Sequence, residues 1–145
     1  MATSNASATI RRCIFKNNWA DDNGGAIATY GTLTIDNCLF SDNTGDDDGS
    51  AINDWGSTTV NNCTFTENTA GSQGVVYNAN SSTSTYNNCI FHNNSGGNTE
   101  GYESSGSSLT YRKCLVSTDG SGTIDSDITQ TLTVSTADPL FNDPS

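Results

Sequence analysis

The sequence predicts an all-β chain wound into a single-stranded parallel β-helix, a solenoid of about five to six coils with about 25 residues each. The first observation behind this prediction is a regular series of cysteines, whose spacings are 25, 25, 26 and 25 residues. The second is the pattern around them: Thr stands four residues before every cysteine, and Phe follows two residues after all but the last. A fixed period of this size indicates stacked structural repeats.

The composition of each repeat favours strands and turns. Thr, Ile, Val, Tyr, Phe and Cys suit strands, whereas Gly, Asn, Asp and Ser punctuate them. No segment keeps an apolar period of 3.6 residues, and about 25 residues are too few for a helix with two crossovers. We therefore expect three short strands and three turns in each coil, with neighbouring coils about 4.8 Å apart.

Alternation in the strand before each cysteine predicts which side chains enter the core. Leu33 and Ile35 are expected to point inward, and Thr32 and Thr34 outward. After a bend, the cysteine and the phenylalanine point inward again, and stacking aligns like residues into columns. The predicted core columns are Cys13, Cys38, Cys63, Cys89 and Cys114, and Phe15, Phe40, Phe65 and Phe91.

The cysteine column is expected to hold free thiols as small core fillers. Stacked sulfurs lie near the coil spacing of about 4.8 Å, whereas a disulfide needs about 2 Å. Tetrahedral zinc needs ligands that converge from different directions, which a straight column does not supply. Five is also an odd number of cysteines, so at least one thiol has no partner within the chain.

Asparagines follow the same period at two places. One set directly precedes the cysteines, and the other lies five residues after them. Asn tolerates the left-handed backbone of sharp bends, and stacked Asn side chains can hydrogen-bond along a ladder. These residues are Asn37, Asn62 and Asn88, and Asn18, Asn43, Asn68 and Asn94.

Length and charge bound the organisation and the partners of the chain. Residues 1–117 are expected to form the β-helix repeats, and residues 118–145 a last partial coil and a C-terminal cap, with a strand near 131–134. The net charge of −11, with only five basic residues, argues against nucleic acid and anionic membranes as partners. No apolar run is long enough to insert into a membrane or to form a signal peptide.

Two motifs carry a family resemblance. Phe15-x-x-Asn18 and its three later copies match an F-x-x-N signature, and Gly24-Gly25-Ala26-Ile27 matches its G-G-A-I companion. Together they resemble the repeats of polymorphic outer-membrane proteins and of other right-handed β-helix proteins of bacterial surfaces. The resemblance implies a right-handed parallel β-helix, an extracellular or cell-surface location, and a structural or adhesive role.

The outward hydroxyl side chains form the first candidate site. Residues six and four positions before each cysteine are Ser or Thr, and stacking would build a flat two-column array. Such an array resembles the threonine faces of ice-binding β-solenoids, although Thr also suits any exposed strand. The candidate residues are Ser7, Thr9, Thr32, Thr34, Ser57, Thr59, Thr83, Thr85, Ser108 and Thr110.

Two acidic corners form the second candidate site, because they fall at equivalent places in adjacent coils. Dense carboxylates repel one another, and Ca²⁺ would relieve that repulsion with oxygen ligands. The alternative is a solvated acidic loop, since neither run has the spacing of a calcium loop. The residues are Asp21, Asp22, Asp46, Asp47 and Asp48.

An aromatic pair forms the third candidate site. Tyr30 and Trp55 are equivalent in neighbouring coils, and each precedes a glycine at a corner. Two stacked exposed rings can bind the face of a sugar, although such rings more often cover a turn.

We expect a protein without catalytic residues. A carbohydrate-active lyase or hydrolase is the alternative, but the basic residues are few and nothing selects a pair of carboxylates.

The first coil is expected to begin within a few residues of Met1, with no helix over its edge. Unpaired backbone at a solenoid end invites another chain. The leading hypothesis is therefore a structural or adhesive module that is either part of a longer exported protein or associates with itself end-to-end through uncapped ends. Carbohydrate and ice are the alternative partners.

Overall fold

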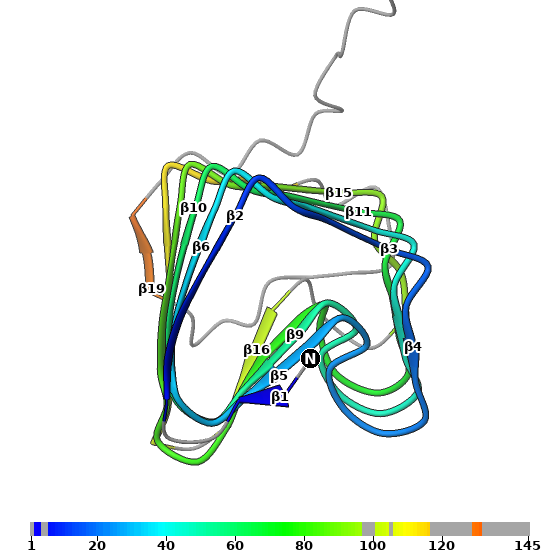
Figure 1. The fold of residues 1–145 in the computed structure, drawn as a ribbon, viewed down its shortest axis with the longest axis horizontal. Helices are drawn as coiled ribbons and strands as arrows, with labels where there is room; N and C mark the ends of the chain where they lie inside the picture. The colour runs from blue at the N-terminus through cyan, green and yellow to red at the C-terminus, as the bar shows by residue number, and fades with distance from the viewer. Residues whose placement is uncertain (1, 4–5, 97–100, 105, 117–128, 132–145) are drawn as a thin grey trace, which may run out of the picture.

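The computed structural model describes residues 2–3, 6–96, 101–104, 106–116 and 129–131. These residues form strands and turns, with no helix among them. Every strand pairing is parallel and joins residues 24 to 26 positions apart, except for the last strand, which follows a shorter interval. Figure 1 looks along the stack, so that successive coils lie over one another. The predicted all-β parallel β-helix is confirmed.

Four parallel sheets run along the stack, and the chain visits them in the order B, C, D and A within each coil. Sheet B contains β2 (Ser7–Arg11), β6 (Thr32–Asp36), β10 (Ser57–Asn61), β14 (Thr83–Asn87), β17 (Ser108–Arg112) and β19 (Thr129–Thr131). Sheet C contains β3 (Ile14–Lys16), β7 (Leu39–Ser41), β11 (Thr64–Thr66), β15 (Ile90–His92) and β18 (Leu115–Val116). Sheet D contains β4 (Trp19–Ala20), β8 (Thr44–Gly45) and β12 (Thr69–Ala70). Sheet A contains β1 (Ala2–Thr3), β5 (Ile27–Thr29), β9 (Ile52–Asp54), β13 (Val76–Asn78) and β16 (Gly101–Glu103).

Two details differ from the sequence-based expectation. The three predicted strands become four in the first three coils, because a second sharp bend after sheet C leaves two residues free to pair in sheet D. The described residues from Ser7 onward complete about four coils and begin a fifth, slightly fewer than the five to six expected. Only β19 is described in the predicted partial coil and cap, and it pairs with β17. The proposed cap and the rest of the strand near 131–134 lie outside the described residues.

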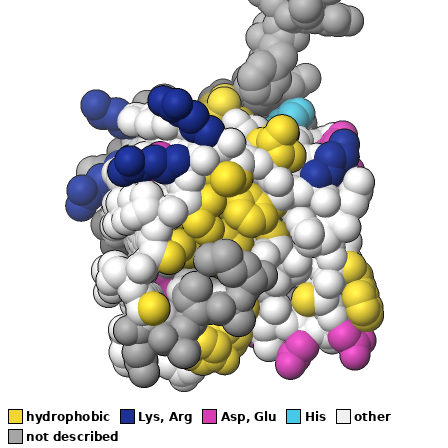
Figure 2. Space-filling view, viewed as in Figure 1, with side chains coloured by type: hydrophobic (Ala, Val, Ile, Leu, Met, Phe, Trp, Pro, Cys, Tyr) yellow, Lys and Arg dark blue, Asp and Glu magenta, His cyan; other side chains and the backbone are white. Residues whose placement is uncertain are grey.

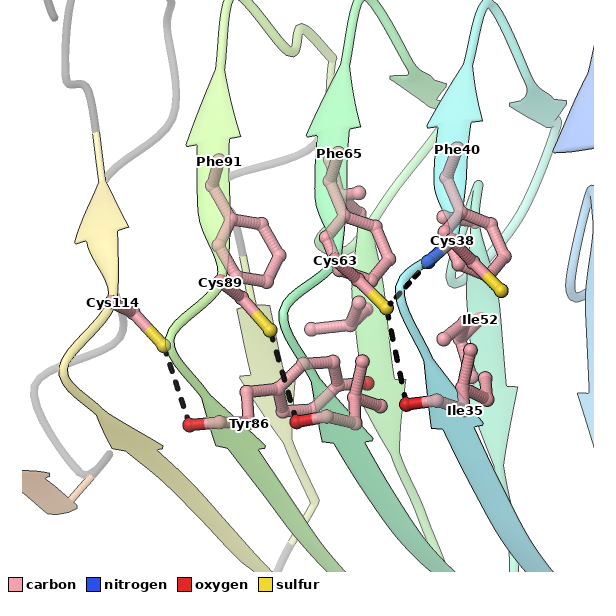
Figure 3. Packing of buried hydrophobic residues seen from close by; sticks show 14 of the residues in the cluster. Ile35, Cys38, Phe40, Ile52, Cys63, Phe65, Tyr86, Cys89, Phe91 and Cys114 are labelled. Carbon is pink, nitrogen blue, oxygen red and sulfur yellow. Dashed lines mark hydrogen bonds between the residues drawn. The ribbon is translucent and has the colours of Figure 1, made fainter. Parts of the chain in front are cut away.

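The core consists of aligned apolar columns. Leu33 and Ile35 are fully buried, whereas Thr32 is exposed, as alternation requires. The four phenylalanine rings stack with centroids 4.8, 4.7 and 4.6 Å apart and planes within 6° of parallel. Figure 3 shows the phenylalanine and cysteine columns side by side, with Tyr86 closing against Phe65 and Phe91. Aromatic pairs of this kind contribute about 0.5–1.5 kcal/mol beyond the burial of their area.

Sharp bends separate the sheets. Asn37, Asn62 and Asn88 have φ of 53 to 54°, so the residue before each of these cysteines adopts the left-handed conformation. Arg12 and Lys113 take the same conformation in the first and last coils, where the sequence has no Asn. Asn is favoured here because its short side chain tolerates a conformation that costs most residues about 1 kcal/mol or more.

The second asparagine set forms a ladder that is buried except at its first member, Asn18, which is exposed in the edge coil. Its members do not themselves adopt the left-handed conformation. That conformation belongs to the residue before each one, for example Glu67 with φ of 57°. Asn43 Nδ2 donates to Asn68 Oδ1 at 2.9 Å and to the Phe15 carbonyl at 3.0 Å, and the Asn43 N–H also donates to Asn68 Oδ1. Asn68 repeats these bonds to Asn94 and the Phe40 carbonyl. Each interior amide therefore uses both N–H groups and both lone pairs.

We predict that Asn68→Ala lowers the free energy of unfolding by at least about 3 kcal/mol, because it leaves several buried donors and acceptors of Asn43 and Phe40 without partners. Urea denaturation followed by circular dichroism measures the loss. Thr69→Ala is the control, since Thr69 is the next residue but is exposed. Equal losses in the two variants would contradict a stabilising role of the ladder.

Candidate functional site

Sheet B carries the predicted hydroxyl residues on its outer side. Strand pairing places them in two columns that continue without interruption from β2 to β17. We call these ten residues the hydroxyl face. The first column is Ser7, Thr32, Ser57, Thr83 and Ser108, and the second is Thr9, Thr34, Thr59, Thr85 and Thr110. No charged side chain lies within either column, and the coils repeat about every 4.8 Å.

A polar column borders the hydroxyl face on the same strands. Arg11 Nε pairs with Asp36 Oδ2 at 2.9 Å, and Asn61 Nδ2 donates to Asp36 Oδ1 at 2.8 Å. Asn87 Nδ2 continues the chain to Asn61 Oδ1 at 2.9 Å. The Asn61 hydrogen bond and then the Arg11 guanidinium hold the pKa of Asp36 below its usual value. The charges of sheet B therefore lie at the border of the hydroxyl face.

The predicted aromatic pair lies at the corner between sheets A and B. The rings of Tyr30 and Trp55 stack with centroids 4.6 Å apart and planes 6° from parallel. Tyr30 is 50% exposed, whereas Trp55 is partly buried. Beside the rings is an open groove of about 270 Å³, which we call the corner groove. Its lining residues are Ala6, Ser7, Tyr30, Gly31, Thr32, Gly56 and Ser57.

An interior polar column, which the sequence analysis missed, holds this corner. The pairing of sheet A aligns Thr29, Asp54, Asn78 and Glu103. Asp54 is fully buried and accepts hydrogen bonds from the Gly56 N–H at 2.8 Å and from the Ser84 hydroxyl. Thr29 accepts the corresponding Gly31 N–H at 3.3 Å. The sequence signal for this column is a polar residue two positions before each corner glycine: Thr29 before Gly31, and Asp54 before Gly56.

Burial raises the pKa of Asp54 above its ordinary value. Desolvation is the largest influence on its pKa and raises it, although the hydrogen bond from Ser84 and the one from the Gly56 N–H act in the opposite direction. The carboxylate lies inside the solenoid, away from the outer faces, so its role is to fix the corner. It does not fit a catalytic acid that meets substrate.

The acidic corners of adjacent coils do come together. The Asp47 N–H donates to the Asp22 carbonyl at 3.2 Å, so the two loops stack. Ser72 Oγ donates to Asp48 Oδ1 at 2.9 Å. Partial burial raises the pKa of Asp48, and repulsion from Asp47 and Asp22 adds to that increase. The loops thus crowd carboxylates, as the sequence predicted.

Asp21 and Asp46, the other two residues of the acidic site, are exposed, as are Asp22 and Asp47. Asp46 Oδ1 accepts a hydrogen bond from the Trp19 indole at 3.2 Å. Within the part of the chain that the structure describes, no group of three or more His, Cys, Asp or Glu side chains could hold a metal ion. Calcium therefore stays a prediction from the sequence.

The cysteines form a single file of free thiols, of which only Cys13 is exposed. The Cys38 N–H donates to Cys63 Sγ at 3.3 Å, and the Cys63 thiol donates to the Asn61 carbonyl at 3.2 Å. Figure 3 shows a second set of thiol bonds along the column, which reach the preceding coil: the Cys63 thiol donates to the Ile35 carbonyl at 3.9 Å, and the Cys114 thiol donates to the Tyr86 carbonyl at 3.3 Å. Burial raises the pKa of Cys63 to about 11, which removes the thiolate needed for nucleophilic chemistry.

These features define a class: a parallel β-helix repeat protein whose columns of like residues set both its core and its faces. The chain belongs to the family described as the right handed beta helix region, whose family model matches residues 1–124, and its coils are right-handed. A search of curated proteins found no match, and neither did a search of solved structures. The closer resemblance to polymorphic outer-membrane proteins stays a prediction. No helix among the described residues is long and apolar enough to cross a membrane.

We predict that Asp54→Asn stabilises the protein at neutral pH. Folding raises the pKa of Asp54. The contribution of this side chain to the free energy of unfolding is therefore fully present below its unfolded pKa and is lost as pH rises through its folded pKa. The variant should melt at a higher temperature than the wild type at pH 7, and the difference should shrink toward about pH 3. Thermal melts across this range measure it.

Asp21→Asn is the matched control, because it removes one exposed carboxylate from the same negative protein. It separates the effect of burial from the general relief of negative charge. If both variants shift the melting temperature equally at every pH, burial of Asp54 does not set the difference.

Proposed function

We propose that this protein is a non-catalytic structural or adhesive module, located outside the cell or on its surface, whose copies join through the open edge of the first coil. The observation that carries the proposal is the edge itself. In the strand orders, β2, β3 and β4 each end their sheets, and no described strand pairs with their free sides. Only sheet A has an additional strand there, the two-residue β1.

The first coil also leaves part of the core uncovered. Ala8, Ile10 and Phe15 are only partly buried, whereas their counterparts in the next coil are fully buried. Ile14, on the outer side of edge strand β3, is 70% exposed, whereas its counterpart Leu39 in the next coil is partly buried. Figure 2 views this end and shows hydrophobic side chains gathered in its middle, with Lys and Arg near one border and acidic residues near another. Apolar surface inside a polar rim is typical of an interaction site.

A second coil of the same kind is a suitable occupant. It would pair backbone groups along three sheets at once and cover the apolar columns with their own residue types. A C-terminal edge placed there would give open filaments, and a second N-terminal edge would give closed dimers. Rigid display and backbone pairing explain the features of the chain without chemistry. A lyase or hydrolase stays the alternative from the sequence.

We predict that the wild-type protein forms larger species as its concentration rises, and that Ala8→Lys keeps it monomeric. The introduced lysine would place a charge on the inner side of edge strand β2, where it blocks stacking but still reaches solvent through the open edge. Sedimentation velocity over a concentration series measures the assembly.

The control is Thr59→Lys, which adds the same charge to the outer side of central strand β10. It should assemble like the wild type, and equal melting temperatures would show that both variants fold. A wild type that stays monomeric at every concentration, with its edge as described, would overturn the proposal.

Ice binding is the second candidate, and the uninterrupted register of the hydroxyl face favours it. Two uncharged columns at a constant spacing can order water into a lattice. We predict thermal hysteresis in freezing measurements that is lost in Thr59→Tyr, because a bulky ring stands in the middle of the face. Thr69→Tyr, exposed on sheet D, should retain it. Absence of hysteresis in the wild type would remove this candidate.

A further inference from the structure

The corner groove owes its shape to backbone that packs unusually closely. A Cβ atom on Gly56 would lie 2.1 Å from the Gly31 carbonyl oxygen, and one on Gly31 would lie 2.1 Å from the Ala6 carbonyl oxygen. Only glycine permits these contacts. Because no side chain emerges at these two positions, the aromatic pair lies directly beside the first column of the hydroxyl face.

Among the described coils, the tight corner between sheets A and B is found at the end of the first two and not at the end of the third. The last residue of sheet A and the first of sheet B are three positions apart at Thr29–Thr32 and at Asp54–Ser57. In the third coil they are five positions apart, from Asn78 to Thr83. The additional residues form a wider bend, so the tight corner with its stacked rings is a local feature of the solenoid.

Tyr30 offers the stacking surface. Trp55 covers one of its faces at 4.6 Å, so its 50% exposure must come from the other face and the edges. The backbone N–H of Trp55 donates to the Thr29 carbonyl at 2.8 Å and fixes the backbone of the corner. Stacking on Trp55 orders the Tyr30 ring before any ligand arrives. The electron-rich face of an aromatic ring attracts the polarised C–H groups that a pyranose presents on its flat side.

Polar groups of matching chemistry border the ring. Ser7, Thr32 and Ser57 line the groove, one from each of three coils about 4.8 Å apart, which is comparable to the length of one sugar unit. Their hydroxyl groups both donate and accept hydrogen bonds. None of the lining residues is charged, although the protein carries a net charge of −11. Such a lining suits a neutral ligand, and the surrounding negative charge disfavours an acidic one.

We propose that the corner groove binds a neutral glycan chain, stacked on Tyr30 and hydrogen-bonded along Ser7, Thr32 and Ser57. The inference deepens the adhesive part of the proposed function and rests on it, because it supplies the ligand that such a module would hold. It does not require assembly through the open edge. Sedimentation of the same samples therefore reports failure of assembly separately from failure of glycan binding.

The test is a nuclear magnetic resonance titration that follows the indole N–H signals of the two tryptophans. The probes are cellohexaose and mannohexaose as neutral glycans, hexagalacturonate as an acidic glycan and decaproline as a peptide. We expect at least one neutral glycan to shift the Trp55 signal and to leave Trp19 unchanged, since Trp19 lies on sheet D. Tyr30→Ala should weaken this binding at least about tenfold.

Two further variants keep the result interpretable. Tyr30→Phe retains the ring and should retain binding, which separates stacking from a general loss of structure. Trp19→Ala removes another exposed ring, 62% exposed, and should bind like the wild type. The proposal is overturned if neither neutral glycan shifts Trp55 at millimolar concentration, if Tyr30→Ala binds as well as the wild type, or if hexagalacturonate or decaproline binds more tightly than the neutral glycans.

Discussion

Parallel stacking at one coil spacing is the constraint on which the rest of this structure depends. Each strand residue pairs with its counterpart one coil away, so a buried polar group that recurs in every coil can be satisfied by its own counterparts. The asparagine ladder meets this condition, because every Asn43 and Asn68 donor finds an acceptor in the neighbouring coils. The phenylalanine rings meet it by stacking face to face at 4.6 to 4.8 Å. Repetition in the sequence is thus the direct consequence of a repeated environment.

The same constraint decides where the chain can change length. Within sheets B and C a change would move every side chain to the wrong column, so the strands keep their lengths over most of the stack. The variation falls at two corners. The corner between sheets D and A shortens from seven positions to six in the third coil, and the corner between sheets A and B grows from three to five positions after the second coil. Asn80 and Ser81 take left-handed conformations there with φ of 56° and 63°. This corner can absorb residues because the strands of sheets A and B end on either side of it.

This constraint also explains which features the sequence could predict. Columns of one residue type, such as Cys63 or Phe65 with their equivalents, appear in the sequence as a repeated residue and could be predicted from it. The interior column of Thr29, Asp54, Asn78 and Glu103 was not, because four residue types fill one position in the pairing. Thr29 and Asp54 accept equivalent hydrogen bonds, from the Gly31 N–H and the Gly56 N–H respectively. The sequence did not predict sheet D, because two residues per coil are too few to show a pattern of alternation.

The two candidate surfaces differ in the same way in how far the sequence predicts them. The hydroxyl face follows from alternation and period alone, so its ten residues could be named beforehand. The corner groove depends on how closely Gly31 and Gly56 bring their backbones together, a distance that sequence letters do not encode.

Assembly and surface display are coupled through the common axis. If a second copy adds its C-terminal edge to the open first coil, sheet B can continue across the junction with its strands in the same direction, because all of its strands, β19 included, are parallel. The hydroxyl faces of successive copies would then follow one another along a common axis. Two copies joined by their N-terminal edges would instead reverse the strand direction at the junction and present two separate faces of fixed length. The geometry of the join therefore decides whether a ligand meets a surface that grows with the assembly or one of constant size.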